Sequence, residues 1–152
     1  MGKISSNGII NLMRGDSFTT PIIVNLGTKL HPNIYKLKTT DRLYFGLMEP
    51  NQAFEDAVLK KVIDSTTPTD DEGNPLLMLK PQDTENLLVG IYYYMIKLRI
   101  IDTFNQECVI TIVNPTVFNL NGHNPKPDED DMYYEKDEYD VDRVIFEGGE
   151  II

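Results

Sequence analysis

The chain has 152 residues, a formal net charge of −10 and one cysteine. This length fits one domain with appendages, and the 41% of hydrophobic residues is enough for a packed core. The lone Cys108 excludes a disulfide framework within the chain. No apolar run reaches the roughly 18 residues of a membrane-spanning helix, so we expect no membrane partner.

The negative charge is concentrated at the C-terminal end of the chain. Residues 124–152 include 11 acidic and three basic residues and so carry −8, whereas residues 1–123 carry −2. Neither part offers the basic patch that neutralises phosphates in nucleic-acid complexes. The composition therefore argues against a nucleic-acid partner.

Strand patterns begin after an N-terminal extension, residues 1–8. Residues 18–26 and 42–48 alternate apolar and other side chains with the period of 2 that is typical of half-buried strands. Their inward side chains are predicted to be Ile22, Val24, Leu26, Leu43, Phe45 and Leu47. Residues 57–63 predict an edge strand, because Lys60 and Lys61 are adjacent and must point to opposite faces.

Turns separate these strands from the next ones. Residues 52–61 partly fit one face of a helix, but the β-branched residues that follow favour a turn and then a strand. The acidic cluster with glycine at residues 70–74 predicts a hairpin loop. It lacks the alternating ligand spacing of a calcium loop, so we interpret its carboxylates as solvated.

The longest strand pattern covers residues 91–101. Its inward face is predicted to hold Tyr92, Tyr94, Ile96, Leu98 and Ile100, and its outward face Tyr93, Lys97 and Arg99. A loop is expected at residues 102–106. Two last strands, residues 108–113 and 116–120, are expected on either side of a break at Pro115.

The segment before the longest strand predicts a corner between two sheets. Pro81 ends a strand because it cannot donate in a ladder, and the side chains of Asp83 and Thr84 can bond to nearby backbone amides. Leu87 and Leu88 are expected to enter the core. The full set of predicted corner residues is Asp83, Thr84, Gly90, Tyr92 and Tyr94, with the turn at Gly90 and one of the tyrosines bonding back to the corner.

About seven short strands within residues 9–121 predict an all-β chain with an immunoglobulin-like β-sandwich. No constellation for chemistry accompanies it. His31 and His123 lie far apart in the sequence, and there is no Gly-x-Ser-x-Gly element and no glycine-rich phosphate loop. A zinc site lacks ligands. We therefore expect no enzyme activity, no metal and no cofactor.

Residues 122–152 are predicted to form an acidic, tyrosine-containing C-terminal arm. Prolines and a glycine mark its start, and the acids that follow cannot bury enough surface to fold alone. The apolar residues near its end are predicted to dock on a partner: Val144, Ile145, Phe146, Ile151 and Ile152. A frayed terminus is the alternative.

Several short motifs together resemble the N-terminal domain of bacteriophage baseplate upper proteins and related virion structural proteins. They are Arg14-Gly15-Asp16-Ser17-Phe18, Asp41-Arg42-Leu43-Tyr44-Phe45, Leu76-Leu77-Met78-Leu79, Asp83-Thr84-x-x-Leu87-x-x-Gly90-x-Tyr92-x-Tyr94-x-Ile96, Thr111-Ile112 and Phe118. The resemblance covers about residues 9–120. It implies an immunoglobulin-like sandwich that plugs into a phage particle and supports receptor-binding or fibre subunits.

That family usually continues into a long linker and a distal assembly domain, where this sequence has the acidic arm. We therefore expect a docking or adaptor subunit of the head, neck, tail or baseplate rather than a receptor-binding protein. Its partners would be other virion proteins, in a homo-oligomer or in multiple copies, and it would be made in the bacterial cytoplasm and reside in the virion. The alternative is a free-standing carbohydrate- or protein-binding sandwich with Tyr93 as an aromatic platform.

Overall fold

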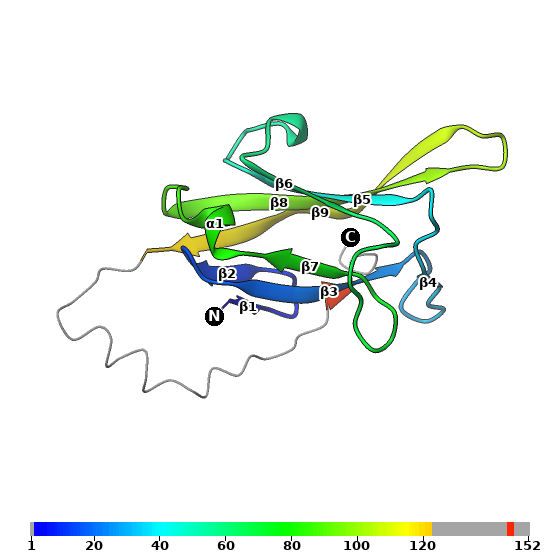
Figure 1. The fold of residues 1–152 in the computed structure, drawn as a ribbon, viewed down its shortest axis with the longest axis horizontal. Coiled ribbons are helices and arrows are strands. Elements are labelled where there is room, and N and C mark those ends of the chain that lie inside the picture. The colour runs from blue at the N-terminus through cyan, green and yellow to red at the C-terminus, as the bar shows by residue number, and fades with distance from the viewer. Residues whose placement is uncertain (1, 123–145, 148–152) are drawn as a thin grey trace.

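The computed structural model describes residues 2–122 and 146–147. The chain is mostly β, with 50% strand and 6% helix, which agrees with the all-β prediction. A curled six-stranded sheet lies against a smaller sheet built around one strand (Figure 1). No helix in the described part of the chain is long and apolar enough to cross a membrane.

The strands have the following bounds: β1 (Lys3–Ile4), β2 (Ile10–Met13), β3 (Phe18–Asn25), β4 (Ile34–Tyr35), β5 (Arg42–Met48), β6 (Leu59–Ile63), β7 (Leu76–Leu79), β8 (Gly90–Ile101), β9 (Glu107–Asn121) and β10 (Phe146–Glu147). Two short helices accompany them, a 3-10 turn at Phe54–Asp56 and α1 at Pro81–Thr84. The 3-10 turn followed by β6 is the turn and strand expected for residues 52–61.

The six-stranded sheet has the order β1-β2-β9-β8-β5-β6, in which only the β2–β9 pair is parallel. β6 lies at one edge, as the adjacent lysines predicted. Residues 2–8, set apart in the sequence as an extension, supply β1 and a turn, and Ile4 joins the core with 5% exposure. The domain therefore includes these N-terminal residues.

The predicted inward faces of β5 and β8 are buried, although Gly46 and Met48 on the other face of β5 are buried too. Leu43, Phe45 and Leu47 on β5 are buried, and on β8 the buried residues are Tyr92, Tyr94, Ile96 and Leu98. Ile100 is partly buried against the same core. Side chains from both sheets join in one cluster, so a single core holds the two layers together.

Two expectations for strand positions are wrong. Leu26 follows the end of β3 and is 38% exposed. The two last strands are one continuous strand, β9, which runs through Pro115. Its register against β8 shifts on both sides of Ile96, and such irregularities are where a proline without an amide hydrogen is accommodated.

The smaller sheet is built around β3. β7 and β4 pair with it antiparallel, and β10 pairs with it parallel. The loop at residues 70–74 is a turn with Gly73 at φ +83°, but the strands on its two sides belong to different sheets. It closes a short hairpin through the antiparallel bridge between Thr69 and Pro75, as predicted, and this hairpin also connects the layers.

Candidate functional site

The corner between β7 and β8 is held by side chains of α1. The Asp83 carboxylate accepts a hydrogen bond from the backbone N–H of Lys80 at 2.8 Å and lies 2.7 Å from the ammonium group of Lys61 on β6. Desolvation pushes the pKa of Asp83 up, but the hydrogen bonds from Lys61 and Lys80 and the charges of these lysines outweigh it, so the pKa is lowered. Asp83 thus joins the edge of the large sheet to the corner.

Thr84 ties the same corner to the turn between β2 and β3. Its side chain is fully buried, and its hydroxyl oxygen accepts a hydrogen bond from the backbone N–H of Gly15 at 2.9 Å. Gly15 has φ +86°, a conformation that side chains other than glycine rarely adopt. The predicted bond to a nearby backbone amide is therefore confirmed for Asp83, whereas Thr84 bonds to an amide 69 residues earlier in the chain.

Tyr92 is the tyrosine that bonds back to the corner. Its hydroxyl donates to the carbonyl oxygen of Leu88 at 2.5 Å, and burial, with the charge of Glu49, raises its pKa. Tyr94 instead donates to the carbonyl oxygen of Gly8 in the N-terminal turn and stacks on Phe45 with ring centroids 5.7 Å apart. Tyr94 thus anchors the N-terminal hairpin, which the sequence did not suggest.

Two details of the predicted corner are wrong. Gly90 is the first residue of β8, and the turn lies earlier, at Glu85 and Asn86. Leu88 is 78% exposed, so it does not enter the core, whereas Leu87 packs against it. The backbone carbonyl of Leu88, not its side chain, is the part that the corner uses.

The predicted arm residues are described only in part. Val144, Ile145, Ile151 and Ile152 lie outside the described residues. Phe146 and Glu147 form β10, whose register partners on β3 are Ile22 and Ile23. A segment from the end of the acidic arm therefore adds a short strand to the edge of the domain's smaller sheet.

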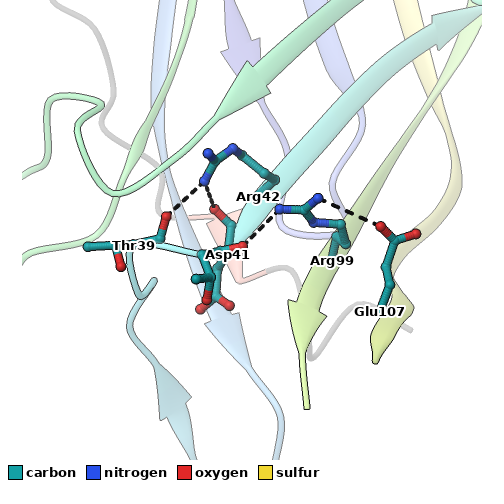
Figure 2. Close-up of polar contacts among 6 residues, drawn as sticks. Thr39, Asp41, Arg42, Arg99 and Glu107 are labelled. Carbon is teal, nitrogen blue, oxygen red and sulfur yellow. Dashed lines mark hydrogen bonds and ion pairs between the residues drawn. The ribbon is translucent and has the colours of Figure 1, made fainter. Parts of the chain in front are cut away.

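Two arginines lie opposite each other on neighbouring strands of the large sheet, where β5 begins (Figure 2). Arg42 and Arg99 are register partners on β5 and β8, and like charges in such positions repel. The guanidinium of Arg42 donates to the carbonyls of Thr39 and Asp41 at 3.0 and 2.8 Å, and that of Arg99 donates to the carbonyl of Thr40 at 2.9 Å. Both arginines therefore brace the loop before β5.

The same loop carries a buried carboxylate. Asp41 is 1% exposed and accepts hydrogen bonds from the Tyr35 hydroxyl at 2.5 Å and from the Lys38 amide at 2.8 Å. Burial and the neighbouring Asp41 raise the pKa of Tyr35 to about 12. The motif at residues 41–45 thus marks a structural brace, and no sequence signal revealed that Arg99 completes it.

The described residues show no arrangement for catalysis. His31 lies exposed in the turn after β3, and His123 lies outside the described part. Cys108 is half-buried on β9, where desolvation and the nearby Asp102 raise the pKa of its thiol, so it is not activated as a nucleophile. No group of three or more potential metal ligands occurs among residues 2–122 and 146–147.

The comparisons with known proteins found no match. No family model, no curated protein and no solved structure is significantly similar to this chain.

Proposed function

We propose that this protein is a structural subunit of a bacteriophage particle, a docking or adaptor protein of the head, neck, tail or baseplate. It would act in multiple copies through contacts with other virion proteins. The observation that carries the proposal is β10, because a strand from the end of an acidic arm pairs with the edge of a sheet. Strand addition of this kind joins subunits in many assemblies.

We also propose that the domain is an immunoglobulin-like sandwich. The order β9-β8-β5-β6, with β3 and β7 paired in the other layer, corresponds to the G-F-C-C′ and B-E strands of such domains. The bond from Tyr92 to Leu88 lies where these domains have their tyrosine corner, near the start of strand F. Both features agree with the sandwich fold that the resemblance implies.

The arm is expected to supply contacts between subunits. Burying one Val, Ile or Phe side chain of the arm contributes roughly 1.5–3 kcal/mol, and ordering the backbone costs about 1–2 kcal/mol per residue. The balance for one arm is small, so many symmetric copies are needed for stable attachment. The acids of residues 128–142 would steer the arm toward basic surfaces and away from acidic ones.

The test is incorporation into the particle of the phage that encodes the protein. In the full chain, the arm's apolar residues Val144, Ile145, Phe146, Ile151 and Ile152 are all replaced by serine. The matched control carries Asp128→Asn and Asp130→Asn. We expect the serine variant to be depleted from purified particles, as measured by quantitative mass spectrometry, and the control to assemble.

Normal incorporation of the serine variant would overturn the arm's role. Two results together would favour the binding-module alternative instead: the protein is absent from all particles, and it shows saturable glycan binding that Tyr93→Ala abolishes.

The proposed function includes no catalysis. The double variant His31→Ala/His123→Ala should therefore assemble normally, and a turnover activity that this variant abolishes would contradict a purely structural function.

A further inference from the structure

The two edges of β3 are used differently. The backbone N–H of Ile22 donates to Pro75 next to β7, and that of Leu26 donates to Asn33 next to β4. Peptide groups alternate in direction along a strand, so β7 and β4 follow one another along one edge. β10 lies on the opposite edge, where it is the only strand among the described residues.

Pro21 limits what this opposite edge can accept. Because Ile22 points its N–H toward β7, the nitrogen of Pro21 faces the opposite edge, and it has no hydrogen to donate. An added strand can therefore pair fully only beyond Pro21. β10 pairs at that place, with Phe146 opposite Ile22 and Glu147 opposite Ile23.

The side chains of β3 beyond Pro21 are buried on both faces of the strand. Ile22 and Val24 belong to the core cluster, so Ile23 points to the opposite face of the strand, yet it is only 9% exposed. The residues from Ile22 to Asn25 are all buried. Continuous burial of this kind is typical of strands covered on both faces, so an added strand can reach β3 only along its backbone edge.

The connection between body and β10 is long enough to reach another molecule. Between Gly122 and Phe146 lie 23 residues, of which nine are acidic and three are basic. Fully extended, they span about 80 Å, several times the radius of a domain of this size, which is roughly 14 Å. The connection is therefore long enough to reach from one copy to the β3 edge of a neighbouring copy.

We propose that, at high concentration and in the assembled state, the β3 edge beyond Pro21 accepts β10 from a second copy of this chain. The pairing within one chain then belongs to the free subunit, and exchange of identical strands between copies joins neighbours without new contacts at the edge itself. This inference rests on the proposed assembly function, since it identifies the partner and the acceptor site of the arm. Close packing in a symmetric particle raises the local concentration of neighbouring arms and favours the exchange.

Cysteine pairs test the exchange in the full chain. In a Cys108→Ser background, one variant carries Ile23→Cys and the other Glu147→Cys, because register partners lie close enough for a disulfide. Mixed at high concentration under mild oxidation, the two variants should form a heterodimer with one bridge, identified by mass spectrometry. About tenfold dilution should lower its yield several-fold.

A matched control shows that the register matters. Thr19→Cys lies on the same face of β3 as Ile23 but on the other side of Pro21, and it should give little heterodimer with Glu147→Cys. Bridges that form only within one chain of the double variant Ile23→Cys/Glu147→Cys, at every concentration and in particles, would overturn the exchange. The incorporation assay above would still report separately on the assembly function.

A second measurement leaves β3 unchanged. A spin label on Glu147→Cys in one population should broaden the amide signals of Ile22 and Ile23 in a second, isotope-labelled population with native β3. The broadening should appear at high protein concentration and vanish on dilution. Its absence at high concentration would also overturn the exchange, even if Ile23→Cys fails to fold.

Discussion

The two sheets of this domain differ in how their strands are paired. In the large sheet, β8 is paired by β9 along its whole length and by β5 from Tyr93 to Arg99, and its side chains alternate between buried and half-buried from Tyr92 to Arg99. In the smaller sheet, β3 is paired piecewise by three short strands, and four consecutive residues are buried. The large sheet therefore supplies a regular core, whereas the smaller sheet supplies an edge at which a further strand can be added.

The largest expected effect is in the centre of the large sheet. Ile96→Ala removes a side chain with 0% exposure from the core, and the lost burial and the cavity should cost about 2–5 kcal/mol. Lys97→Ala, on the outward face, loses only its contact with the Phe54 ring at 4.7 Å and should cost less than about 1 kcal/mol. Urea unfolding compares the two, and equal destabilisation would show that the register is wrong.

The next effect concerns the junction between the layers. Thr84→Val keeps the shape of the side chain but leaves the Gly15 amide without its acceptor, which should cost about 1–3 kcal/mol. Thr103→Val, in the exposed loop after β8, serves as the matched control and should be close to neutral. Thermal unfolding measures both variants, and a neutral Thr84→Val would mean that the corner does not hold the β2–β3 turn.

A smaller effect is expected from the tyrosine at the corner. Tyr92→Phe removes the hydroxyl that donates to Leu88 and should cost about 0.5–1.5 kcal/mol. Tyr93→Phe, on the opposite face of the same strand, should change the free energy of unfolding little. Chemical denaturation of both variants makes the comparison, and equal costs would argue against a special role for Tyr92.

The smallest effect depends on pH. The pKa of Asp83 is lowered in the folded state, so its stabilising contribution is present above its ordinary value near 3.8 and is lost as the pH falls through the lower folded value. Asp83→Asn should therefore be less stable than the natural chain at pH 7, and the difference should shrink toward pH 3. Urea titrations at both pH values check this. A difference in the free energy of unfolding that is independent of pH would exclude the charge of Asp83 as its cause.

The sequence predicted the large sheet better than the small one, for a physical reason. Alternation in β8 reflects a strand with one buried and one half-buried face, and that pattern is visible in the residues themselves. β3 is buried on both faces beyond Pro21, so alternation fails there, and the pattern does not show that the strand ends at Asn25, before the exposed Leu26. Pro115 was interpreted as a break because single-sequence patterns do not reveal that an irregular register can carry a proline within a strand.

The candidate site was predictable only in its local part. Asp83 is of a residue type that bonds to nearby amides, so its bond to the Lys80 amide could be inferred from the sequence, whereas the bond of Thr84 to Gly15 could not. The bond between Tyr94 and Gly8 joins residues far apart in the chain, and no local pattern encodes it. The same holds for β10, because the register of Phe146 opposite Ile22 depends on where the folded domain leaves an edge.

Pro21 has a consequence for the solubility of this protein. Exposed sheet edges nucleate fibrils when strands from many molecules stack along them, and this chain must accumulate in a cell before use under the proposed function. Because Pro21 has no N–H, the stretch of β3 edge that strands of other molecules can pair with is shorter. The residues beyond Pro21 can still pair with β10. Replacing Pro21 with valine should therefore make concentrated preparations more prone to form thioflavin-positive aggregates.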